Sequence, residues 1–212
     1  MPPISLKQLR PAYNERAMLV GATGTGKTTL ARQLLQVYSA ILVIDSKCTY
    51  GGKRGEPGYR MVSSPGGLRW ITKGVKLIQY RPDEESQGVD DYNAVYRWAY
   101  KRGDILVYTD EAFLVHRGSH SPDYLRNCCT CGRELGIGMI TGTQRPTGID
   151  LRIMTEAEVF YCFQLRHRDD RKRMAEMMGE EVMTDPEEHA FWFWRAGMKG
   201  PSIQSRLKIG GG

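Results

Sequence analysis

The sequence predicts an α/β fold with a mostly parallel central sheet and helices on both faces, and three observations indicate it. Short apolar runs alternate with helical stretches, which is the rhythm of strands joined by crossover helices. These runs lack polar alternation, as strands buried on both faces do. The length of 212 residues suits one domain with its own core, which we place at residues 1–209, followed by a flexible glycine tail at 210–212.

The first half of the chain supplies two strands, a helix between them and a long loop. Ala17–Val20 and Ile41–Ile44 are apolar throughout, and apolar residues at helical spacing predict a helix from Lys27 to about Tyr38. Residues 46–76 are rich in glycine, proline and lysine, so they predict a loop with one short helix around 65–72. Loops of this length usually carry a function or are disordered.

The second half continues the alternation. Strands are predicted at 76–80, 105–108, 137–141 and 158–163, and helices at 91–101, 122–135 and 169–178. The run Phe191–Trp194 is apolar on both faces and is predicted to close the sheet as an edge strand. We expect its tryptophans to pack against the core or another subunit rather than to stack on bases.

The composition is ordinary for a globular protein, with 41% hydrophobic and 25% charged residues. No apolar run approaches the ~20 residues of a membrane helix, and the N-terminus lacks the apolar stretch of a secretory signal, so a cytoplasmic protein is expected. Five cysteines, an odd number, fit free thiols. Cys128, Cys129 and Cys131 lack the spacing of a zinc site and are predicted to be small, buried or half-buried residues of a helix.

Charge is unevenly distributed, although the net charge of +6 is only a weak indication of a polyanionic partner. Residues 46–82 contain eight basic residues and one acid, and the last eighteen contain four basic residues and no acid. An acidic patch, residues 83–91, lies between them. The alternative interpretation is two solvated surfaces of opposite sign.

Residues Gly21–Thr28 read Gly-Ala-Thr-Gly-Thr-Gly-Lys-Thr and fit the phosphate-binding pattern G-x-x-x-x-G-K-[ST], between a predicted strand and a predicted helix. Glycines let such a loop wrap a phosphate, so that its amides and the helix N-terminus face the negative charge. The predicted nucleotide-binding residues are Gly21, Ala22, Thr23, Gly24, Thr25, Gly26, Lys27, Thr28 and Thr29. Lys27 is expected to reach the β- and γ-phosphates, the Thr28 hydroxyl to coordinate Mg²⁺, and Thr29 to lie on the α-phosphate side.

Asp110 and Glu111 directly follow the apolar strand at 105–109. Asp110 is predicted to be a Mg²⁺ ligand, directly or through water, and Glu111 the general base that polarises the attacking water. The two strands at 41–45 and 76–80 lie between these motifs in the sequence, and at least one of them is expected between the two nucleotide strands in the sheet. These features together predict a single RecA-like (ASCE) P-loop NTPase domain.

A further buried strand ends in Thr143-Gln144-Arg145-Pro146. This pattern resembles the FtsK/HerA superfamily of DNA-translocating ATPases, whose sensor strand ends in the same tetrapeptide. The resemblance spans residues 17 to about 165 in family order and extends to Gly21–Leu30, Val43–Lys47, Asp110-Glu111 and Arg133–Ile137.

The resemblance implies roles for particular residues. Gln144 is expected to read the γ-phosphate or its water. Arg133 matches the family's arginine finger, given to the nucleotide of the neighbouring subunit, with Arg145 and Arg126 as rivals. Such a finger is worth on the order of 10³–10⁵ in rate. A finger acting in trans requires an oligomer, so the resemblance implies a homo-oligomeric ring, a hexamer or a pentamer.

The short chain leaves little room for accessory domains and resembles the compact genome-packaging ATPases of membrane-containing icosahedral viruses and phages. That likeness implies ATP- and Mg²⁺-dependent translocation of double-stranded DNA into a procapsid, in the host cytoplasm or at a packaging vertex of the virion. Capsid or membrane-associated vertex proteins would be further partners, and basic loops such as residues 47–60 would line the channel.

Three alternatives remain open. A plasmid- or conjugation-type DNA pump usually carries membrane segments or an extra all-α domain, and a nucleotide-dependent phage assembly protein typically has a membrane helix after its ATPase core; neither is visible in this sequence. The third alternative, a regulatory nucleotide-binding module, does not account for Glu111 and Gln144.

Overall fold

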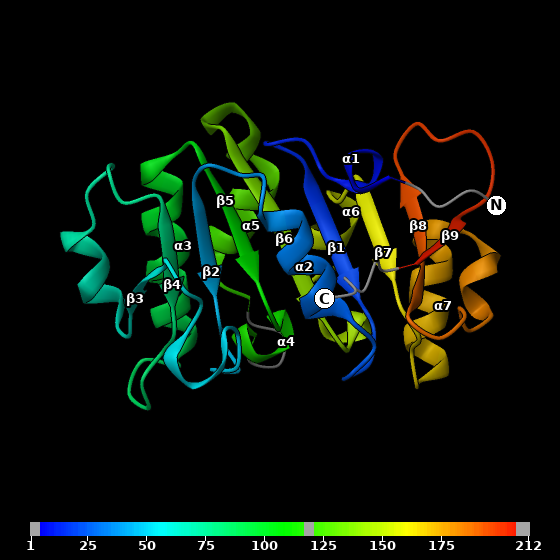
Figure 1. Cartoon of the computed structure of the whole chain (residues 1–212), viewed down its shortest axis with the longest axis horizontal. Coiled ribbons are helices and arrows are strands. Elements are labelled where there is room, and N and C mark those ends of the chain that lie inside the picture. The colour runs from blue at the N-terminus through cyan, green and yellow to red at the C-terminus, as the bar shows by residue number, and fades with distance from the viewer. Residues whose placement is uncertain (1–4, 117–120, 207–212) are drawn as a thin grey trace.

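Nine strands and two layers of helices make up the computed structural model, which describes residues 5–116 and 121–206 (Figure 1). The strands are β1 (Arg16–Val20), β2 (Ile41–Ile44), β3 (Arg60–Val62), β4 (Leu77–Tyr80), β5 (Ile105–Thr109), β6 (Ile137–Thr143), β7 (Val159–Cys162), β8 (Ala190–Arg195) and β9 (Ile203–Arg206). They form one sheet in the order β3-β4-β2-β5-β6-β1-β7-β8-β9. The strands from β3 to β7 in this order pair in parallel, and β8 and β9 are antiparallel. The predicted α/β class is confirmed.

Helices cover both faces of the sheet, as predicted (Figure 1). The α-helices are α1 (Leu6–Leu9), α2 (Lys27–Leu35), α3 (Val89–Arg102), α4 (Ala112–Val115), α5 (Asp123–Thr130), α6 (Leu151–Thr155) and α7 (Arg168–Met178). Short 3₁₀ helices are η1 (Gly52–Arg54), η2 (Pro65–Trp70), η3 (Gly132–Leu135), η4 (Pro146–Gly148) and η5 (Glu180–Met183). Within the described part of the chain, no helix is long and apolar enough to cross a membrane.

Alternation along the strands divides the core into two layers. In β1, Ala17 and Leu19 face the layer that includes α2, whereas Met18 and Val20 face the layer formed by α3, α5, α6 and α7. Successive side chains of a strand point to opposite faces, so a strand covered on both sides is buried at every position and is mostly apolar. All five residues of β1 are buried accordingly.

The prediction that the strand at 41–45 or the strand at 76–80 lies between the two nucleotide strands is wrong. Neither β2 nor β4 lies between β1 and β5; β6 lies there instead and pairs in parallel with both. Gly142 explains why β6 fits this position, since a Cβ atom at this residue would lie 2.6 Å from the carbonyl oxygen of Asp110. The consequence is functional, because β6 brings its carboxyl end between the ends of β1 and β5.

The strand at Phe191–Trp194 is also not at the edge. It forms β8 and pairs with β7 on one side, but β9 pairs on its other side, so the edges of the described sheet are β3 and β9. The sequence of β9, Ile-Gln-Ser-Arg, lacks the apolar run that would have revealed it. The tryptophans of β8 pack against the core as predicted, and Trp192 Nε1 donates to the carbonyl of Thr184 at 2.9 Å.

Two predicted helices are shorter than expected. The helix at 122–135 is interrupted at Cys131, where α5 gives way to η3. Cys128 and Cys129 are buried on α5 as predicted, and Cys131 is exposed. The helix from Lys27 ends at Leu35, before Tyr38. The remaining predicted elements are present within a few residues, β3 lies inside the predicted loop, and the predicted glycine tail falls outside the described residues.

Candidate P-loop NTPase site

A pocket of about 340 Å³ lies at the carboxyl edge of the sheet, where the loop between β1 and α2 begins. Its lining residues are Thr23, Gly24, Gly26, Lys27, Thr28, Thr29, Lys47, Thr49 and Asp110. In parallel strands the carboxyl ends meet at one edge, so residues following β1, β2, β5 and β6 converge here. We call this cavity the P-loop pocket.

The loop itself has the backbone that phosphate binding requires. Gly26, immediately before α2, has a φ of +108°, a conformation that a side chain would strain. Lys27 is the first residue of α2, and its Nζ donates to the carbonyls of Gly21 at 2.6 Å and Ala22 at 2.9 Å. Burial lowers the pKa of Lys27 to about 8, since the opposing effect of Glu111 only partly offsets it.

Asp110 and Thr28 provide adjacent oxygen atoms of the kind that bind a metal ion. Thr28 Oγ1 donates to Asp110 Oδ1 at 3.3 Å, and the hydroxyl of the buried Tyr108 donates to the same oxygen at 2.6 Å. Mg²⁺ takes oxygen ligands and usually keeps several waters, so it needs few ligands from the protein when a nucleotide supplies the others. These two side chains fit that requirement. The described residues include no group of three or more His, Cys, Asp or Glu side chains that could hold a metal ion by themselves.

Glu111 is buried and has hydrogen-bonding partners on both carboxylate oxygens. Oε1 accepts from the backbone N–H of Gln144 at 3.0 Å, and Oε2 accepts from Gln144 Nε2 at 2.7 Å. Lys47 Nζ lies 2.9 Å from Oε2. Burial raises the pKa of Glu111, but the hydrogen bond and charge of Lys47, together with Gln144, outweigh it, so the pKa lies below its usual value. Glu111 is therefore a carboxylate at neutral pH.

Gln144 connects this carboxylate to the P-loop. Its side-chain oxygen accepts a hydrogen bond from Thr23 Oγ1 at 2.5 Å, while its amide nitrogen donates to Glu111. The insertion of β6 between β1 and β5 is what places Gln144 between these two residues. The residues predicted as P-loop, Mg²⁺ ligand, general base and sensor thus lie in one continuous site.

Lys47 and Thr49 line the P-loop pocket although the sequence did not predict either as a site residue, and Lys47 is the one of the two that contacts Glu111. It was expected on a DNA-channel loop, but the structure places it in the P-loop pocket against Glu111. The available signal was its position three residues after the end of β2, the strand beside β5. Asp45 fixes the intervening turn, since its buried carboxylate accepts from the backbone of Thr49 and Tyr50 and pairs with Arg81.

Arg133 does not contact the P-loop pocket of its own chain. It lies in η3 at the amino end of β6, whereas Gln144 follows the carboxyl end, and the seven residues of β6 span about 20 Å. Its guanidinium is half exposed and pairs with Glu158. The rival Arg145 directly follows Gln144 and pairs with the buried Asp170 at 3.1 Å.

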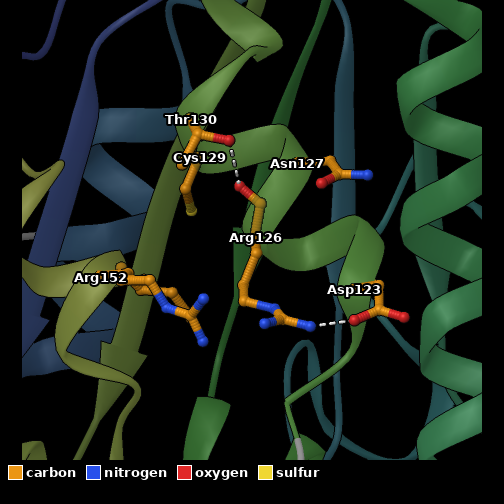
Figure 2. Close-up of a pocket in the computed structure, with 7 residues that line it drawn as sticks. Asp123, Arg126, Asn127, Cys129, Thr130 and Arg152 are labelled. Atoms are coloured by element: carbon orange, nitrogen blue, oxygen red, sulfur yellow. Dashed lines mark hydrogen bonds and ion pairs between the residues drawn. The ribbon is translucent and has the colours of Figure 1, made fainter.

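The second rival, Arg126, lies on α5 in a different cavity. Figure 2 shows its guanidinium reaching toward Asp123, with Arg152 pointing into the same space from α6. This cavity has a volume of about 440 Å³. Arg126 therefore lies away from the P-loop pocket as well.

No protein-family model and no curated protein sequence matches the chain. Several solved structures do. The genome packaging NTPase B204 from Sulfolobus turreted icosahedral virus 2, in complex with AMPPCP, is similar with a TM-score of 0.75 at 15% identity, over 93% of this chain and 100% of that chain. The pCW3 conjugation coupling protein TcpA with ATPγS has a TM-score of 0.54 at 17% identity, over 92% and 61% of the two chains.

A third similar structure is the N-terminal domain of zonular occludens toxin from Neisseria meningitidis, with a TM-score of 0.51 at 14% identity, over 92% of this chain and 94% of that chain. At such identities the likeness shows the fold. The predicted α/β fold, with a mostly parallel sheet and helices on both faces, is confirmed and is shared with these solved structures.

Proposed function

We propose that this protein is an ATP-hydrolysing motor that translocates double-stranded DNA, in the packaging of a viral or phage genome. The observation that carries this proposal is a single site at the carboxyl edge of the sheet. Lys27 and Asp110 line its pocket, and Glu111 and Gln144 adjoin it through contacts with the lining residues Lys47 and Thr23. The structural likeness to a packaging NTPase over the full length of that chain supports it.

The chain's own residues account for each part of the hydrolysis. The amides of the P-loop and Lys27 would bind the phosphates, and Thr28 and Asp110 would hold Mg²⁺, which neutralises charge on the phosphate oxygens. Glu111 accepts a proton from the water that attacks the γ-phosphorus, the bond to the bridging oxygen breaks, and ADP leaves. Gln144 orients that water, because a neutral amide can hold it without competing for the proton.

A basic groove offers a surface for the DNA backbone. Arg69, Arg97 and Lys101 line a cavity of about 340 Å³ between η2 and α3, and none of them forms an ion pair with any described residue. None of the described residues that line this groove is acidic. Unneutralised cations bind phosphates regardless of base sequence, which suits a motor that must move along any DNA.

The arginine finger and the ring belong to the same proposal. Arg133 lies near the amino ends of the parallel strands, opposite the carboxyl ends that hold its own P-loop pocket. Its side chain is half exposed, which suits action on a neighbouring subunit. A homo-oligomeric ring, hexameric or pentameric, would bring the two together, in the host cytoplasm or at a packaging vertex. Capsid or membrane-associated vertex proteins would be its further partners.

The test compares ATP hydrolysis without nucleic acid and with long duplex DNA, single-stranded DNA or RNA. Strong stimulation by duplex DNA alone is expected. No stimulation by any nucleic acid would contradict a DNA motor and favour the alternative of a nucleotide-dependent phage assembly protein.

The basic groove is tested by duplex binding at several salt concentrations. The triple variant Arg69→Ala, Arg97→Ala, Lys101→Ala should bind more weakly and with a shallower salt dependence, because three phosphate contacts are lost. Lys172→Ala, an exposed cation on α7 at the other end of the sheet, is the control (Figure 1). Equal affinities of the triple variant and the control would exclude this groove as the DNA site.

A further inference from the structure

The P-loop pocket contains a second lysine besides the one that its motif predicts. Lys47 and Lys27 both line it. Lys27 Nζ donates to backbone carbonyls of the loop, whereas Lys47 Nζ lies 2.9 Å from Glu111 Oε2. The Lys47 side chain is 29% exposed and that of Glu111 only 3%, so the lysine reaches the carboxylate from the open side of the pocket.

The backbone around Lys47 is held firmly. Asp45 Oδ1 accepts from the backbone N–H groups of Thr49 at 2.9 Å and Tyr50 at 3.1 Å, which closes the turn that carries Lys47. Ser46 Oγ donates to the carbonyl oxygen of Glu111 at 3.0 Å. The turn is therefore tied to the residue that Lys47 contacts, while the lysine's own four-carbon side chain keeps rotational freedom.

The position of Glu111 places Lys47 near the reacting phosphate. A general base lies within roughly 2.6–3.2 Å of the water from which it takes a proton. Lys47 Nζ is bonded to the same carboxylate, so it lies within two hydrogen-bond lengths of that water. The attacking water in turn lies next to the γ-phosphorus.

We propose that Lys47 is a nucleotide-binding residue that exchanges Glu111 for the γ-phosphate when ATP enters the pocket. This inference rests on the proposed ATPase function. The terminal phosphate carries more negative charge than a carboxylate and offers three oxygens to the ammonium group. The exchange removes the cation from Glu111 Oε2, where it competes with the attacking water. ADP lacks the terminal phosphate, so with ADP bound Lys47 stays on Glu111.

The test measures binding of two nucleotides, a non-hydrolysable ATP analogue and ADP, by calorimetry in the presence of Mg²⁺. Lys47→Met should weaken binding of the analogue by about 10-fold or more, the usual worth of one charge-assisted hydrogen bond, and binding of ADP by less than about 3-fold. Lys47→Arg should retain most of the preference. Lys53→Met, an exposed lysine of the same loop, is the matched control and should bind both nucleotides as the wild type does.

The possible outcomes distinguish failure of the proposed Lys47–phosphate contact from failure of the proposed ATPase function. Equal weakening of both nucleotides by Lys47→Met, or no weakening, would overturn the proposed phosphate contact while leaving the ATPase proposal intact. Binding of neither nucleotide by the wild type would overturn both proposals. Lys47→Gln serves as a second variant if Lys47→Met does not fold, as judged by circular dichroism, and it must show the same selective loss.

Discussion

Asp45 offers the sharpest test of how the site is built, because its carboxylate is fully buried at the end of β2. Oδ1 accepts from two backbone N–H groups of the following turn. Oδ2 accepts from Gln79 Nε2 at 2.9 Å and from Arg81 Nε at 2.8 Å. The substitution Asp45→Asn preserves the size of the side chain but replaces one acceptor oxygen with a donor NH₂ group.

The magnitude follows from these contacts. The Asn oxygen can still accept the two backbone N–H groups, so its NH₂ group must face the donors of Gln79 and Arg81. Removing one partner of a buried ion pair costs about 3–5 kcal/mol. Arg81, which is 12% exposed, keeps its bond to the carbonyl oxygen of Tyr50, so the lower end of this range applies. We expect a loss of about 3 kcal/mol in the free energy of unfolding.

Urea unfolding followed by circular dichroism measures this loss, with the slope of the transition unchanged. For a chain of this size the melting temperature should fall by roughly 6–12 °C. Asp83→Asn, an exposed aspartate in the same region, is the control and should change stability by less than about 0.5 kcal/mol. A loss below about 1 kcal/mol for Asp45→Asn would refute the view that this ion pair holds the turn.

Three further predictions concern the P-loop pocket. Lys27→Ala should abolish nucleotide binding or hydrolysis, because it removes the ammonium group expected on the phosphates. Glu111→Gln should still bind ATP but hydrolyse it at least about 100-fold more slowly, the usual worth of a general base. Mixing Arg133→Ala subunits with Lys27→Ala subunits should recover part of the ATPase rate. The Arg133→Ala subunit keeps an intact P-loop pocket, and a neighbouring Lys27→Ala subunit supplies the arginine.

Steady-state ATPase assays with parallel binding measurements check all three. Unchanged turnover of Lys27→Ala would contradict the P-loop assignment. Near wild-type turnover of Glu111→Gln would indicate that a residue other than Glu111 is the general base. Absence of recovery at every mixing ratio, with oligomers intact by light scattering, would count against Arg133 acting in trans.

Much of the site could be predicted from the sequence because its residues lie in local patterns. The P-loop needs its glycines and its lysine within eight consecutive residues, since one turn of backbone must wrap one phosphate. Asp110 and Glu111 directly follow an apolar strand, and Gln144 follows another. In a parallel sheet such positions face one edge, so their meeting was expected.

The order of the strands could not be predicted in the same way. A buried strand does not specify its neighbour, and both β2 and β6 are buried throughout. The close approach of Gly142 to the end of β5 favours β6 in the central position. β9 was missed because its short polar sequence carries no strand pattern.

What the sequence by itself determined is the class of fold and the phosphate-binding pattern of the P-loop, because both depend on residues near one another in the chain. What only the tertiary structure decided is which distant residues complete the site. Lys47 looks like any other lysine of a basic loop, and it becomes a partner of Glu111 because β2 and β5 are neighbours in the sheet. Pairing of strands far apart in sequence sets such contacts, and no local pattern records it.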